Sequence, residues 1–152
     1  MWWKQGLKDR LGELAGACYC VAASDGHVAD EEMAVIVDQI VAFAGRDVAV
    51  AEVEALLTSA RDAVQAAGID AYVAGLGRRL DEESRSQLLS AAAATMLADG
   101  EIAASERGVY SQIARALGVP AREAEFLIAT VEASHRAAAA NAQRPASAPG
   151  TT

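Results

Sequence analysis

Carboxylates stand at positions of this chain where a helical pattern would place apolar residues. The apolar stripe that ends in Cys18 and Val21 reaches Asp25 at the next helical step. Glu32 stands one helical step before Ile36, where the next apolar stripe begins. An aspartate and a glutamate seven residues apart therefore flank an Asp-Gly turn, on the side expected to face the protein interior.

The same pattern recurs 74 residues later along the chain. Asp99 follows a stripe that ends in Met96, and Glu106 stands three residues before Val109. Hard cations such as calcium and magnesium take oxygen ligands, and zinc accepts carboxylates beside histidine. Partly buried carboxylates are costly unless they are paired. We therefore expect Asp25, Glu32, Asp99 and Glu106 to bind a divalent cation, namely calcium, magnesium or zinc.

A metal-free interpretation stays open for both turns. A glutamate in the first turn of a helix can accept hydrogen bonds from the free backbone N–H groups there, with no cation involved. Regular EF-hand chelation is excluded, because the first half of such a loop would need carboxylates where the chain has Val21, Ala23, Thr95 and Leu97. A cation would need ligands from elsewhere, for example from both turns together.

Periodicity and glycine stops predict an all-α fold, a seven-helix bundle with an internal pseudo-twofold duplication. Alanine, the best helix former, is the most frequent residue. The expected helices span residues 4–24, 30–44, 50–67 (with a break near Ser59), 70–80, 81–98, 104–117 and 120–140. Residues 1–140 are expected to form a single domain, and residues 141–152, rich in Ala, Pro, Ser and Gly, a disordered tail.

The 152 residues carry a net charge of −8, which disfavours nucleic acid as a partner. No apolar run is long enough to span a bilayer, and charged residues interrupt the N-terminal region where a secretory signal would lie. We therefore expect a cytoplasmic protein. Trp2, Trp3 and Lys4 are typical of a weak contact with the inner membrane surface, although the tryptophans could instead fold back on the bundle.

Nucleophiles and histidines do not combine into a catalytic set. Cys18 and Cys20, two residues apart on one helix, point to roughly opposite faces and are expected to be small buried residues. His27 adjoins one acidic turn and is expected to be exposed, and His135 has no evident partner. We therefore predict that the protein is not an enzyme.

The two turns resemble those of the TerB family of tellurite-resistance proteins. The resemblance rests on residues 22–32 (AASDGHVADEE), residues 96–106 (MLADGEIAASE) and residues 113–119 (IARALGV), and it covers roughly residues 5–135. It implies an all-helical pseudo-symmetric bundle with a non-enzymatic role in tellurite and general stress resistance, alongside membrane-associated Ter proteins. It also implies metal binding by Asp25, Glu32, Asp99 and Glu106.

The chain departs from the family at the helix caps, where Ala29 and Ala103 replace the usual Ser, Thr or Asp. Our leading hypothesis is a stress-response protein whose acidic turns bind a divalent cation and thereby modulate binding to protein partners. The alternative is a metal-free helical adaptor or dimerisation module, in which alanine-rich faces allow two copies to approach closely.

Overall fold

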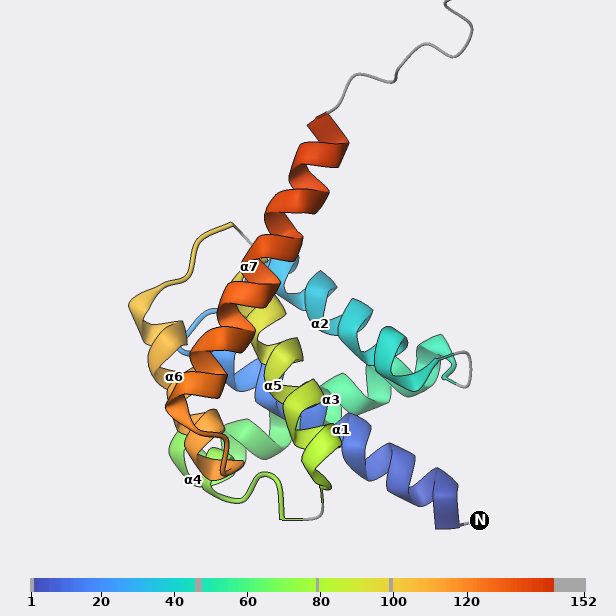
Figure 1. Cartoon of the computed structure of the whole chain (residues 1–152). Coiled ribbons are helices and arrows are strands. Elements are labelled where there is room, and N and C mark those ends of the chain that lie inside the picture. The colour runs from blue at the N-terminus through green and yellow to red at the C-terminus, as the bar shows by residue number, and fades with distance from the viewer. Residues whose placement is uncertain (1, 46–47, 79, 99, 144–152) are drawn as a thin grey trace, which may run out of the picture.

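A computed structural model shows an all-α fold, as the sequence predicted (Figure 1). It describes residues 2–45, 48–78, 80–98 and 100–143, with backbone only for 2–9 and 143. Its seven helices are α1 (Trp2–Ala22), α2 (Asp30–Ala44), α3 (Val50–Ala67), α4 (Ile69–Ala74), α5 (Glu82–Met96), α6 (Ala104–Ala116) and α7 (Ala121–Gln143). The predicted internal duplication remains a prediction.

Helices α1 and α5 lie side by side at the centre of the bundle, and the other helices pack around them (Figure 1). Leu14, Cys18 and Val21 of α1 are almost fully buried, as are Leu88 and Leu89 of α5. Helices that are surrounded on all sides need apolar or small residues around their whole circumference. This requirement explains why the two most apolar stretches of the sequence became the central helices.

The core has two parts that share α1. One part lies mainly among α1, α4, α5, α6 and α7, and the other lies mainly among α1, α2 and α3. Cys20 belongs to the first part and Cys18 to the second, which confirms that the two thiols point to different sides of α1. Both cysteines are free and fully buried.

Two helices differ most from the sequence expectation. Helix α3 continues without a break through Ser59. Helix α4 ends at Ala74 instead of continuing to Leu80, and the φ of 85° at Gly77 is incompatible with a right-handed helix that would run on to Leu80. Arg85 of α5 then secures the loop, donating from Nη2 to the Gly77 carbonyl at 2.8 Å and from Nε to the Leu80 carbonyl at 3.1 Å.

Helix α4 packs over α1 at a glycine. Gly16 is buried, and the ring of Tyr72 occupies the space that a side chain at Gly16 would need. Burial is the main cause that raises the pKa of Tyr72 to about 12. The glycine therefore allows α4 to lie close to the central helix.

Helix α7 packs against α5 and α6 through its first half only. The Tyr110 hydroxyl of α6 donates to the Ala124 carbonyl of α7 at 2.6 Å, and Ile128 is buried in the core. From residue 133 to residue 142 every side chain is exposed, and this half of α7 extends away from the bundle (Figure 1). The helix continues through residues 141–143, and the remainder of the expected tail, residues 144–152, lies outside the described residues.

Candidate functional site at the paired turns

The turn after α1 meets the first turn of α6 in the folded protein. The Ser24 hydroxyl donates a hydrogen bond to the Ser105 hydroxyl at 3.2 Å, across 81 residues of sequence. Because α1 and α5 lie side by side and α6 begins just after α5, the two acidic turns reach the same corner of the bundle. This contact could not be predicted from the repeat, since Ser24 and Ser105 are not at equivalent positions of it.

The two turns share a local geometry. Gly26 and Gly100 have φ angles of 88° and 89°, a region that glycine adopts without strain and other residues rarely enter. Ala29 and Ala103 precede their helices with nearly the same extended backbone, at φ −74° and ψ 155° and at φ −73° and ψ 151°. Because these angles are so similar, α2 and α6 begin with the same backbone geometry after their turns.

Both glutamates cap the helix that contains them. Oε1 of Glu32 accepts a hydrogen bond from the backbone N–H of Ala29 at 3.1 Å, and Oε1 of Glu106 accepts one from Ala103 at the same distance. Alanine has no side-chain oxygen to return the bond, so only the glutamate half of a capping box is present. Glu32 is half-buried and Glu106 is buried, with 8% of its surface exposed.

Asp25 does not continue the inward face of α1. Its side chain is exposed, and Oδ1 accepts the backbone N–H of His27 at 3.0 Å. The helix ends at Ala22, so the helical spacing that placed Asp25 on the buried face no longer applies there. His27 is exposed, as the sequence suggested. Asp99, the fourth predicted ligand, lies outside the described residues.

The donor chemistry of the corner fits a hard cation better than a soft one. Carboxylate and hydroxyl oxygens are the groups that calcium and magnesium prefer, and the two turns with the helix starts that follow them carry Asp25, Glu32 and Glu106 together with the two serines. In the part of the chain that the structure describes, no three His, Cys, Asp or Glu side chains gather closely enough to form a metal site. A cation site here therefore depends on Asp99 or on movement of the described side chains.

The buried thiols are separate from this corner and chemically quiet. Burial raises the pKa of Cys18 to about 11, although a hydrogen bond with Thr95 acts in the opposite direction. Burial, followed by the neighbouring Cys18, raises the pKa of Cys20 to about 12. A thiol that stays protonated near neutral pH is a poor nucleophile and a poor metal ligand. The cysteines therefore act as packing residues, as expected from the sequence.

The N-terminal residues predicted to touch a membrane form the first turn of α1. Trp2, Trp3 and Lys4 are helical, and their side chains lie outside the described residues. Among the helices that the structure describes, none is both long enough and apolar enough to cross a bilayer.

Comparisons with known proteins agree with the fold and identify the family. The model of the family described as tellurite resistance protein TerB matches residues 11–129. A solved structure of a protein of unknown function from Porphyromonas gingivalis W83 is similar to the chain with a TM-score of 0.55 and 23% sequence identity, covering 82% of this chain and 95% of that one. At this identity the likeness shows a shared fold. No curated protein matches the chain. The family match extends over both acidic turns, all of α2 to α6 and the packed half of α7, and the chain belongs to the TerB family.

Proposed function

We propose that this TerB-family chain acts in tellurite and stress resistance without catalysis, by binding a divalent cation at its paired turns and changing how it binds protein partners. The observation that supports the proposal is the hydrogen bond between Ser24 and Ser105, which brings two acidic turns of the same geometry to one corner. A single acidic turn would be adequately explained as a helix cap.

The helix caps and a cation can use the same carboxylates. Each glutamate accepts its backbone N–H through Oε1, and an ionised carboxylate can accept several interactions on its two oxygens. Asp25 and Glu32 from one turn, with Asp99 and Glu106 from the other, would supply the negative charge. A bound cation would offset the cost of placing aspartates near the C-terminal ends of α1 and α5, where the helix dipole disfavours negative charge.

The position of the turns explains how binding could influence partners. The first turn joins central helix α1 to α2, and the second joins central helix α5 to α6. A cation held by both turns would tie the two helix pairs together and restrict their relative movement. A ligand shifts such an equilibrium by its differential affinity for the two arrangements, so a partner that prefers the tied arrangement would bind more tightly.

Calorimetric titration of the full chain with calcium, magnesium and zinc tests this proposal. The double variant Asp25→Asn/Asp99→Asn should lose the binding heat. Glu32→Gln/Glu106→Gln should also weaken binding, while glutamine keeps an oxygen that can accept the cap hydrogen bond, so the fold should survive. Glu54→Gln, an exposed acid on α3, serves as the matched control.

The possible results separate a cation site from simple helix capping. Saturable binding by the parent chain and by Glu54→Gln, lost in both double variants, supports the proposal. If no cation gives heat or a thermal shift at millimolar concentration, the paired turns are structural and the cation proposal is wrong.

The proposal also places the protein in the cytoplasm, with Trp2, Trp3 and Lys4 making a weak contact with anionic lipid. Sedimentation with anionic vesicles should retain the parent chain more than a Trp2→Ala/Trp3→Ala variant. Equal retention of the two proteins would exclude this contact.

A further inference from the structure

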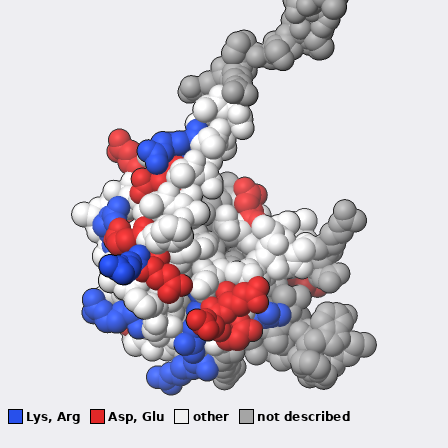
Figure 2. Space-filling view, viewed as in Figure 1, with Lys and Arg blue, Asp and Glu red and all other residues white. Residues whose placement is uncertain are grey.

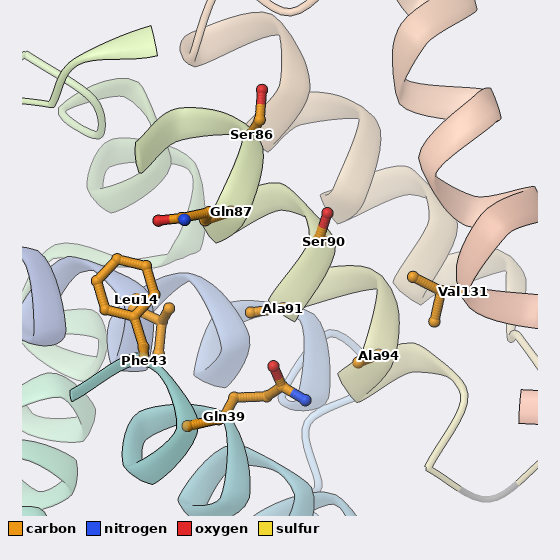
Figure 3. Close-up of a pocket in the computed structure, with 10 residues that line it drawn as sticks. Leu14, Gln39, Phe43, Ser86, Gln87, Ser90, Ala91, Ala94 and Val131 are labelled. Atoms are coloured by element: carbon orange, nitrogen blue, oxygen red, sulfur yellow. The ribbon is translucent and has the colours of Figure 1, made fainter. Parts of the chain in front are cut away.

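The outer side of α7 is uncovered in the part of the chain that the structure describes. There the helix contacts α5 and α6 and no other helix, and it lies at the front of the bundle in Figure 1. Its inner side carries Ile128, which is buried, and Val131, which lines a groove of about 560 Å³ along α5 (Figure 3). Phe126 lies on the opposite side with 69% of its surface exposed, and it is the largest exposed apolar side chain among the described residues.

Residues on this outer side follow one another at alternating steps of three and four. The row consists of Phe126, Ala129, Ala133, Arg136 and Ala140, and all five are exposed. Alternating steps of three and four are the spacing of a seam between two paired helices, because they keep one row of side chains facing a partner over several turns. The row therefore has the pattern of a helix-pairing surface along the whole length of α7.

The second half of α7 needs a packing partner that its own bundle does not supply. Every side chain of residues 133–142 is exposed, although the segment is helical. An isolated helical segment of this length is marginal in water even when rich in alanine, and it gains stability by packing. The row that begins at Phe126 on the packed half continues into this segment, so one partner helix can cover both halves.

We propose that α7 pairs through this row with α7 of a second copy of the chain, in an antiparallel arrangement. The two-fold axis passes at the level of residue 131, so residues equally far before and after this level face each other. Ala129 then faces Ala133 of the second copy, and Phe126 faces Arg136. Residues 121–141 of the two helices overlap, which is a length of about 31 Å.

Side-chain sizes fit this register. A side chain in a paired-helix seam inserts among four residues of the facing helix. For Phe126 the four residues of the second copy are Ala133, Arg136, Ala137 and Ala140. Three of them are alanines, which leave room for the ring, and the guanidinium of Arg136 can lie over the ring face in a cation–π contact. At the axis, alanine faces alanine, so the helix axes can approach to about 8 Å.

Charges beside the row fit the same register. Glu125 is exposed and pairs with Arg107 of its own chain at 3.1 Å. The antiparallel register brings Arg136 of the second copy to within one residue of the position facing Glu125, about 1.5 Å along the axis. Glu132 comes near its own copy at the axis, and Arg136, one turn later on the same helix, offsets this repulsion. Figure 2 shows acidic and basic side chains beside the uncoloured surface of α7.

A parallel pairing in register does not fit, because it places Arg136 beside Arg136 and Glu125 beside Glu125. Like charges that face each other across helices are destabilising. The charges therefore favour the antiparallel orientation.

The expected dimer is small and independent of the paired turns. Its interface is self-complementary, because each copy contributes the same row. A single pair of helices lies near the lower limit of about 1,200 Å² for a standard interface, so we expect a dissociation constant in the micromolar range. The inference does not rest on cation binding. A chelator should leave the dimer unchanged, so failure of the cation proposal and failure of the dimer are separate results.

Sedimentation equilibrium of the full chain measures the association. At about 200 µM the parent protein should have twice the mass of the 15.7 kDa chain, with or without EDTA. Phe126→Ala removes the ring and Arg136→Glu reverses the charge that faces Glu125, so each should raise the dissociation constant at least about tenfold. Glu125→Lys/Arg136→Glu restores opposite charges and should recover dimerisation.

Disulfide cross-linking tests the register. A mixture of the Ala129→Cys and Ala133→Cys variants should form a linked pair on mild oxidation, because these two positions face each other. Each variant alone should not, since the antiparallel register separates like positions by four residues, about 6 Å along the axis, which is too far for a disulfide. The native Cys18 and Cys20 are fully buried and do not compete.

Matched controls on α3 keep the test independent of folding. Val50→Ala removes another exposed apolar side chain, and Arg61→Glu reverses another exposed arginine, so both should dimerise as the parent does. Circular dichroism verifies the helix content of each variant.

Three results would overturn the proposal. The parent chain could be monomeric at about 200 µM, a concentration that reveals even weak association. Phe126→Ala and Arg136→Glu could dimerise as well as the two controls, which would place the interface elsewhere. Ala129→Cys or Ala133→Cys alone could cross-link while their mixture gives no mixed pair, which would show a parallel pairing.

Discussion

Replacing Gly16 with alanine should destabilise the protein, although alanine is the better helix former. Gly16 lies in the middle of α1, where α4 crosses it. A Cβ atom there would lie 2.7 Å from Cε1 of Tyr72, and closer still to Cζ and Oη, whereas ordinary contacts begin at 3.4 Å. The ring must therefore move, and α4 must move with it or lose its packing on α1.

Gly12, one turn earlier on the same helix, provides a matched control. A Cβ atom at Gly12 would meet no heavy atom within 4 Å. Gly12→Ala should therefore raise the free energy of unfolding by about 1 kcal/mol through helix propensity alone. Gly16→Ala makes the same gain but adds an overpacking cost of about 1–3 kcal/mol, so its net effect is zero to about 2 kcal/mol of destabilisation.

Thermal and urea unfolding of the two variants measures the difference. For a chain of this size, a gap of 1–3 kcal/mol corresponds to a difference in Tm of roughly 3–10 °C, with Gly12→Ala the more stable. In a Tyr72→Ala background the cost at Gly16 should disappear, because the obstructing ring is gone. Equal stabilisation by both alanines in the parent chain would refute the close packing of α4 on α1.

The cap and the thiols give two further predictions. Glu106→Ala should lower the free energy of unfolding by about 1–2 kcal/mol, because it removes the bond to the Ala103 amide, while Glu106→Gln should cost less; chemical denaturation of both variants checks this. Burial raises the pKa of Cys18 to about 11 and that of Cys20 to about 12, so the unfolded chain ionises its thiols at a lower pH than the folded one. The stability that comes from keeping the thiols protonated is then fully present below about pH 8.5 and is lost as the pH rises toward 11. Urea unfolding at pH 7 and pH 10 should therefore show a smaller loss of stability for a Cys18→Ala/Cys20→Ala variant than for the parent chain.

The number and order of the helices could be predicted because their stops are chemically explicit. Gly26, Gly45, Gly68, Gly100 and Gly118 each follow an apolar stripe, and all five adopt positive φ angles at or near the end of a helix. The buried faces of the helices could be predicted in the same way, from the spacing of the apolar residues along the sequence. The length of α4 could not be predicted, because the effect of Gly77 depends on how the loop packs against Arg85.

The candidate site was predictable in its residues but not in its arrangement. The glutamates stand where their position in the sequence placed them, because the third residue of a helix lies within reach of the free amide just before it. The direction of Asp25 depended on where α1 ends, which periodicity does not determine. The contact between Ser24 and Ser105 is tertiary, and nothing local in either segment encodes it.

The central claim is that the two acidic turns form a single cation site, and an NMR titration of the backbone amides tests it most directly. On addition of calcium, magnesium or zinc, the amide signals of Gly26 and Gly100 should move together, with one common saturation curve, while amides of α3 stay in place. Signals that do not move at millimolar cation, or that move at one turn only, would contradict a shared site.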